Sequence, residues 1–304
     1  MPLRIRTFCA VLAVSACAGA RAAAVRDPYV GAIAVVADTG EVLRADCADG
    51  LAYPASVTKL MTALLVLDDV AAGKFSLDDM VVASPTRTKA DVHYRQPSCI
   101  GIPPGAALPV DDMLKALLVH SANDAAIYLA EKCSGSVDEF VARMNARAAE
   151  LGMKNTRYCN PNGLPPPAWA KERRFNTSTC RDQAVLAREI LAKRPEMLKY
   201  TSLKTCEIAL PRGKVKFVNH NNVMVKNKLK VLNPDGTEAV DGMKTGFIKA
   251  GGSSVVLTGS RGGHRVVVVV LGSPSAAIRD AAARNLMEEA LGALSWRGAP
   301  RRGR

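Results

Sequence analysis

The sequence is poor in aromatic residues, which make up 5% of its 304 residues, and it has neither a Cys-x-x-Cys pair nor an internal repeat. Few aromatics, together with lysines and arginines that are scattered despite a net charge of +13, argue against DNA or RNA as a partner. The cysteine spacing argues against a zinc site, and we expect neither a metal nor another cofactor. What remains is the composition of an ordinary globular protein.

The N-terminus has the pattern of a secretion signal. Arg4 and Arg6 give the positive start, residues 8–18 form an apolar core too short to span a bilayer, and Ala20-Arg21-Ala22 resembles a cleavage site. We therefore expect a signal peptide over residues 1–22 and export to the periplasm or cell envelope. An alternative is a lipoprotein, because Val14-Ser15-Ala16-Cys17 resembles the bacterial lipobox and Cys17 would then anchor the protein to the membrane.

Cleavage after Ala22 would leave six cysteines in an oxidising compartment, where up to three disulfides could form. The sequence does not determine their pairing, and each could instead be a small buried apolar side chain. The high positive charge suits either a solvated surface or contact with anionic envelope polymers and lipids. The six cysteines are Cys47, Cys99, Cys133, Cys159, Cys180 and Cys206.

Strand patterns lie near both ends of the chain, with helical patterns between them. Residues 29–37 and 41–45 predict one hairpin, residues 205–219 a second, and residues 253–271 a third. Residues 84–109 lack periodicity and are expected to be loop. Helices are predicted over about 56–72, 110–120, 124–132, 137–151, 181–193 and 276–291.

The economical arrangement is an α/β (α+β) fold in which both chain ends build one antiparallel sheet and a helical lobe is inserted between them. We expect a single catalytic domain over residues 23–295, followed by a basic tail at 296–304. Its sheet lobe would comprise about 26–55 and 240–295, and its helical lobe 56–239. A cleft between the lobes is the expected place for a site.

A serine and a lysine at helical spacing form the first candidate for chemistry. Ser56 and Lys59 lie three residues apart at the start of a predicted helix, so both face the same side. A serine becomes nucleophilic when a neighbour takes its proton, and a lysine can do so if burial and a second cation lower its pKa. Alone this pair is weak, because such spacing also arises by chance on surface helices.

Two further motifs follow in the chain. Ser121-Ala122-Asn123 sits between two predicted helices, and Lys244-Thr245-Gly246 leads into an apolar strand. Each has an ordinary structural explanation when taken alone, as a helix cap or a strand end. Together, each once and in this order, the three patterns match the Ser-x-x-Lys, Ser-x-Asn and Lys-Thr-Gly signature of penicillin-binding proteins and class A β-lactamases.

With these motifs and their flanks, the chain resembles low-molecular-mass penicillin-binding proteins of the D-alanyl-D-alanine carboxypeptidase family from about Val30 to Leu291. The resemblance implies the serine β-lactamase/transpeptidase-like fold. It also implies a serine enzyme that removes the terminal D-alanine from peptidoglycan stem peptides and is covalently inhibited by β-lactams. The flanks that carry it further are residues 53–65, 144–156, 160–163, 219–221 and 240–246.

The family pattern also implies a role for each matching residue. Ser56 would be acylated, Lys59 would take its proton, and Ser121 would relay a proton to the departing amine. The other residues would bind substrate: Asn123 holds the peptide amide, Lys244 keeps the pocket positive, Thr245 meets the carboxylate, and Gly246 admits the chain. The Phe247 and Ser56 N–H groups would form the oxyanion hole. Arg279 is a candidate second carboxylate contact or a surface arginine, and His220 is expected to be structural.

Several departures from the family keep other readings open. Ala122 stands where glycine is frequent, residues 84–105 match poorly, and the cysteine content is unusual. The usual C-terminal β-rich domain and anchor helix are not found in the sequence. The alternatives are a DD-endopeptidase, a β-lactamase, for which no deacylating glutamate segment is visible, and a non-catalytic peptidoglycan-binding relative.

Overall fold

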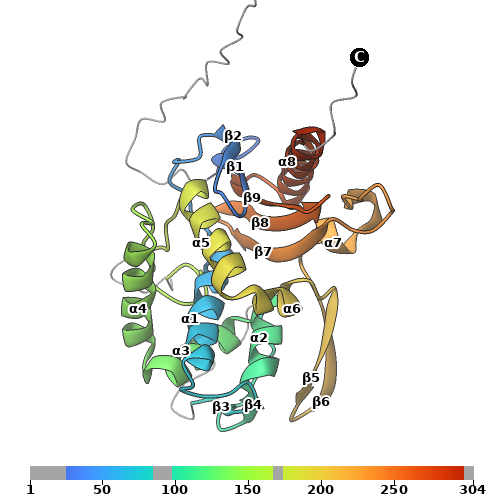
Figure 1. Ribbon diagram of the computed structural model, residues 1–304. Helices are drawn as coiled ribbons and strands as arrows, with labels where there is room; N and C mark the ends of the chain where they lie inside the picture. The colour runs from blue at the N-terminus through green and yellow to red at the C-terminus, as the bar shows by residue number, and fades with distance from the viewer. Residues whose placement is uncertain (1–24, 85–97, 167–173, 298–304) are drawn as a thin grey trace, which may run out of the picture.

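The computed structural model describes residues 25–84, 98–166 and 174–297, with one five-stranded antiparallel sheet as its largest element (Figure 1). The strand order is β2-β1-β9-β8-β7. The two N-terminal strands therefore join the three C-terminal strands through the pairing of β1 with β9. This confirms the predicted sheet built from both chain ends. The strands are β1 (Gly31–Val36), β2 (Val42–Asp46), β7 (Val240–Ile248), β8 (Gly252–Arg261) and β9 (His264–Ser273).

Strand β9 lies inside the sheet and is buried on both faces. Val266, Val268 and Val270 face one hydrophobic core, while Val267, Val269 and Leu271 face the other. This alternation follows from the two-residue period of a strand. Helix α8 (Ala276–Arg297) covers the first face, and α5 (Cys180–Lys193) packs against the second. Strand β7 is left at the sheet edge, where the helical lobe begins.

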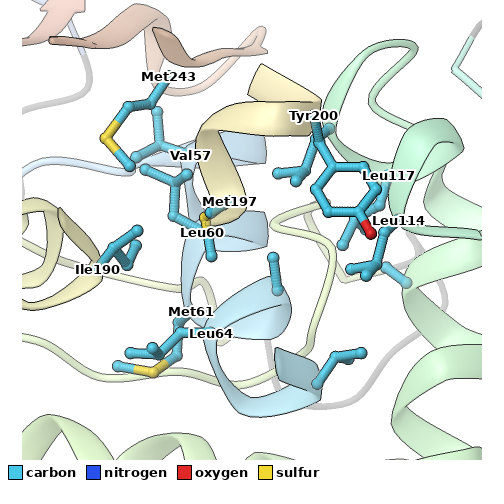
Figure 2. Packing of buried hydrophobic residues seen from close by; sticks show 14 of the residues in the cluster. Val57, Leu60, Met61, Leu64, Leu114, Leu117, Ile190, Met197, Tyr200 and Met243 are labelled. Carbon is cyan, nitrogen blue, oxygen red and sulfur yellow. The ribbon is translucent and has the colours of Figure 1, made fainter. Parts of the chain in front are cut away.

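A buried helix, α1 (Lys59–Ala71), forms the centre of the helical lobe (Figure 2). Every residue from Lys59 to Leu67 is buried, because other elements surround the helix. Leu60 and Leu64 pack among side chains of α2, α5 and the segment after α5. A short 3₁₀ turn, η1 (Ala55–Thr58), precedes α1, so the helix predicted from Ser56 is 3₁₀ in its first turn. Ser56 is thereby fixed at the head of a rigid element.

The remaining elements surround α1. The two-stranded sheet of β3 and β4 was not predicted, because its strands of three residues are too short for a periodic signal, and β4 lies inside the segment expected to be loop. Helix α8 extends past its predicted end at Leu291. The other elements are α2 (Val110–Leu118), α3 (Asn123–Ser134), α4 (Val137–Glu150), η2 (Pro195–Met197), α6 (Leu198–Thr201), α7 (Asn222–Val225), η3 (Asn227–Leu229), β3 (Met80–Val82), β4 (Ala107–Pro109), β5 (Thr205–Leu210) and β6 (Gly213–Val218).

Some predictions fall outside the described residues. These are the signal peptide over 1–22 with Cys17, most of the loop over 84–105, and the basic tail after Arg297. The six cysteines at positions 47–206 are not joined by disulfides in the structure. Within the described ranges, no helix is long and apolar enough to cross a membrane.

Candidate active site

The residues predicted from the three motifs come together at one pocket of about 470 Å³ beside the edge strand β7. Lys59 and Lys244 are buried behind its lining, with 0% and 2% of their surfaces exposed, and they contact the lining residues Ser56, Asn123 and Thr245. The structure therefore gathers all nine predicted site residues, although they are separated by up to 223 positions (279 − 56) in the sequence. The seven that line the pocket are Ser56, Ser121, Asn123, Thr245, Gly246, Phe247 and Arg279.

The amine of Lys59 has three partners at hydrogen-bond distance. Its Nζ lies 2.8 Å from Ser56 Oγ, 2.8 Å from Asn123 Oδ1 and 2.8 Å from the main-chain oxygen of Asn162. Two of these partners are carbonyl oxygens, which can only accept. A neutral amine would give them its two N–H groups and turn its lone pair toward the Ser56 hydroxyl. The arrangement can therefore take a proton from Ser56.

The charge state of Lys59 follows from its surroundings. Burial, reinforced by the nearby positive charge of Lys244, holds the pKa of Lys59 well below its usual range. Burial and the charge of Arg279 lower the pKa of Lys244 to about 7. The Lys244 ammonium donates a hydrogen bond to Thr245 O at 2.9 Å. A buried amine with a lowered pKa and a second, titratable amine thus lie beside the same pocket.

A turn that the sequence reasoning did not assign to the site holds the acceptor for Lys59. Asn160 Oδ1 accepts a hydrogen bond from Gly163 N at 2.7 Å, which closes the turn around Asn162. Asn176 fixes this turn against η1, since its Nδ2 donates to Thr58 Oγ1 at 3.0 Å and to Asn160 O at 2.9 Å. The resemblance covered residues 160–163, but a main-chain acceptor leaves no side-chain signal in a sequence.

The second motif shapes the opposite wall. Ser121 has φ +64° and lies just before α3, an uncommon conformation for a non-glycine residue and one that clusters at functional sites. Asp124, which is buried, accepts hydrogen bonds from the N–H groups of Ile100, Gly101 and Ile102 at 3.2, 2.8 and 3.3 Å. Asn123 Oδ1 faces Lys59, and the amide nitrogen of Asn123 makes no hydrogen bond among the described residues, so this nitrogen is the group that can meet a ligand.

The third motif brings β7 against the head of α1. A Cβ on Gly246 would lie 2.5 Å from Pro54 O and 3.1 Å from Ser56 N, so only glycine permits this approach. The next residue, Phe247, lines the pocket with 63% of its surface exposed. An extended chain could therefore lie along this edge with its reacting carbonyl above Ser56.

One histidine, His220, lines the pocket, and a second, His120, packs against it. The rings of His120 and His220 are 5.4 Å apart in an edge-to-face arrangement, and His120 also lies 4.5 Å from Phe217. Burial and the charge of Lys244 lower the pKa of His220 to about 4, so its ring is neutral at pH 7. The part of the chain that the structure describes holds no group of three or more His, Cys, Asp or Glu residues that could bind a metal ion.

Comparison with known proteins gives consistent matches over most of the chain. Residues 25–275 match the family described as D-alanyl-D-alanine carboxypeptidase. The chain is 31% identical over 257 residues to D-alanyl-D-alanine carboxypeptidase DacF of Bacillus subtilis, and 33% identical over 242 residues to DacC of Escherichia coli. These alignments cover 84% and 79% of this chain, but only 60% and 56% of the relatives. The chain thus spans less than two thirds of their length.

Solved structures of penicillin-binding proteins also match most of the chain. PBP3 from Streptococcus pneumoniae, described as a peptidoglycan synthesis regulatory factor, superposes with a TM-score of 0.75 at 30% identity, covering 87% of this chain and 72% of that protein. Penicillin-binding protein D2 from Listeria monocytogenes, in its ampicillin-bound form, superposes with a TM-score of 0.69 at 28% identity, covering 86% of this chain and 97% of that one.

Proposed function

The chain belongs to the D-alanyl-D-alanine carboxypeptidase family, and on this basis we propose that it is a serine-type D-Ala-D-Ala carboxypeptidase that trims peptidoglycan stem peptides. Membership confirms the resemblance drawn from the three motifs. The observation that carries the proposed activity is the 2.8 Å contact between Lys59 Nζ and Ser56 Oγ, made by a buried amine whose pKa is lowered. A nucleophile in contact with its base is the arrangement that acyl transfer requires.

In the proposed acylation, Lys59 removes the proton of the Ser56 hydroxyl as Oγ attacks the carbonyl between two D-alanines. The C–N bond then breaks, and Ser121 relays the proton to the departing amine. The N–H groups of Ser56 and Phe247 would stabilise the oxyanion, where donors held in place are worth more than mobile water. Water then hydrolyses the ester, and Lys59 again serves as base.

Substrate orientation would come from the remaining groups. The Asn123 amide nitrogen would bind the backbone of the peptide, which lies along β7 beside Gly246. The terminal carboxylate would meet the Thr245 hydroxyl, with Lys244 supplying positive charge beneath it. Arg279 lines the same pocket and would be the second carboxylate contact. This polar end of the pocket fits a chain that terminates in a charge.

The proposal includes the setting of the reaction. One catalytic domain over residues 23–295, exported behind a signal peptide, would act in the periplasm or cell envelope, and a lipid on Cys17 would attach it to a membrane. Peptides ending in D-Ala-D-Ala would be its substrates and β-lactams its covalent inhibitors, in keeping with the ampicillin-bound form of the Listeria protein.

The test is release of D-alanine from a pentapeptide ending in D-Ala-D-Ala, with and without penicillin. We expect the protein to release D-alanine from this pentapeptide, and we expect penicillin to inhibit the release. The same peptide ending in D-Ala-L-Ala should not be cleaved. A folded protein that binds penicillin but releases no D-alanine would contradict the proposal. Sustained hydrolysis of penicillin would instead favour a β-lactamase, and cleavage confined to cross-linked dimers an endopeptidase.

A further inference from the structure

The guanidinium of Arg279 is held in the pocket wall by the residue that follows it. Both Arg279 Nε and Nη2 donate to Asp280 Oδ1, at 2.8 and 2.6 Å. The two side chains are only 5% and 2% exposed. Within the described residues the hydrogen bonds of this guanidinium leave from Nε and Nη2, so Nη1 is the part that remains for a ligand in the pocket.

A third residue fixes Asp280 from another element. Asn222 in α7 donates from Nδ2 to Asp280 Oδ2 at 2.8 Å, while Arg279 and Asp280 belong to α8. Each carboxylate oxygen therefore has its own partner, and the plane of the carboxylate is set from two directions. Because the guanidinium binds this carboxylate through two nitrogens, its orientation is set as well.

Such support is needed because the charge of Arg279 is felt by a second cation, Lys244. The Arg279 charge contributes to the lowered pKa of that amine. Like charges repel, and an arginine side chain has many rotamers that would carry its guanidinium away from Lys244. A buried carboxylate beside Arg279 offsets this repulsion without neutralising Lys244.

We propose that Asp280 is a positioning residue, which with Asn222 holds the Arg279 guanidinium in the orientation that recognises the terminal carboxylate of the substrate. This inference rests on the proposed function, because it concerns a substrate that ends in a carboxylate. The competing role is purely structural: Asp280 could simply compensate a buried positive charge. The two roles differ in whether Asp280 affects selectivity for a carboxylate.

The experiment compares two thioester substrates with the same D-alanyl acyl group. The leaving thiol carries a free carboxylate in one and its methyl ester in the other, and the released thiol is followed. Asp280→Asn should lower the ratio of kcat/KM for acid over ester about tenfold, mainly through the KM of the acid, as expected for one charge-assisted hydrogen bond. Glu288→Gln is the matched control, since Glu288 also lies on α8 and pairs with Arg261 at 3.0 Å.

The same ratio measured in an Arg279→Ala background tests whether Asp280 acts through Arg279. In that background, Asp280→Asn should not lower the acid-to-ester ratio of kcat/KM any further. An unchanged ratio in the single variant, or an equal additional loss in the Arg279→Ala background, would overturn the inference.

If Asp280→Asn does not fold, Asn222→Ala replaces it. Asn222→Ala should lower the acid-to-ester ratio of kcat/KM, but it should not lower the ratio further in the Arg279→Ala background. An unchanged ratio in the single variant, or an equal decrease in the Arg279→Ala background, counts against the inference. A wild-type protein that turns over neither thioester counts against the proposed function itself. A wild type that discriminates, with an Asp280→Asn variant that discriminates equally, counts against the inference alone.

Discussion

The backbone of Gly163 lies directly against the carbonyl of Ala55, so close that a Cβ on Gly163 would overlap the Ala55 oxygen. Through this contact, the turn around Asn162 packs against Ala55, the residue that precedes Ser56. The Asn162 oxygen, an acceptor for Lys59, and the Ser56 hydroxyl are therefore held in one rigid unit. The glycine has φ +82°, which also disfavours a side chain.

Gly163→Ala should therefore impair acylation even though it removes no functional group. A displacement of about 1 Å at a reacting group can cost about 10²-fold, and we expect a loss of that order in the rate of acylation by penicillin. Gly152→Ala is the matched control, because Gly152 also has a positive φ, +71°, but has nothing within 4 Å of an added Cβ. Equal acylation rates in the two variants would contradict the positioning role of this contact.

Lys59→Ala should slow acylation by about 10²–10⁴-fold, the usual contribution of a general base. The change leaves Ser56 in place but removes the only amine in contact with its hydroxyl among the described residues. Lys193→Ala, at the exposed end of α5, is the control for loss of a lysine. Stopped-flow acylation by a fluorescent penicillin measures the effect, and a near-normal rate for Lys59→Ala would exclude it as the base.

The pH profile of kcat/KM should fall on the alkaline side with an apparent pKa of about 7, because Lys244 loses its proton there and no longer attracts the carboxylate. The acidic limb of the profile should report the deprotonation of Lys59, at a pH well below the usual lysine pKa because burial and Lys244 lower the pKa of this amine. A substrate with an esterified carboxylate should lack the alkaline limb. A free-acid substrate with constant kcat/KM up to about pH 10, near the usual lysine pKa, would contradict this assignment.

Lys244→Met should stabilise the protein at neutral and acidic pH while weakening substrate binding. In the fold the pKa of Lys244 is about 7 instead of 10.5, so below pH 7 both states carry the proton and the full cost of a buried charge is present. As pH rises from about 7 to 10.5 the folded state gains relative stability, and the advantage of methionine should shrink. We expect a Tm higher by about 2–4 °C at pH 6 for each kcal/mol gained. A Tm at pH 6 that is lower for Lys244→Met than for the wild type would contradict the destabilising effect assigned to the charged Lys244.

The sequence predicted the sheet and the central helix because both have strong apolar patterns. The valines of β9 form an apolar run between turn residues, and Leu60 and Leu64 repeat at helical spacing. The two-stranded β3–β4 sheet was missed because strands of three residues contain no full pattern. The end of α8 was misplaced because residues after Leu291 continue the helix on a partly exposed face.

The site likewise contains residues that the sequence predicted and residues that it did not. Ser56, Ser121 and Lys244 belong to short motifs that can be recognised in one dimension, and the structure brings them to one pocket. Asn162 acts through its main-chain oxygen, and Asp280 through a guanidinium on the neighbouring residue. Neither contribution depends on a pattern of side chains along the chain, so both are visible only in the three-dimensional structure.

Covalent modification of Ser56 by penicillin is the most direct test of the account. Intact-protein mass spectrometry should show one added penicillin on the wild-type protein and on Ser98→Ala, a change at another serine that lines the pocket. It should show none on Ser56→Ala, and peptide mapping of the wild type should place the adduct on Ser56. An adduct that survives in Ser56→Ala would put the nucleophile elsewhere and contradict the assignment of this site.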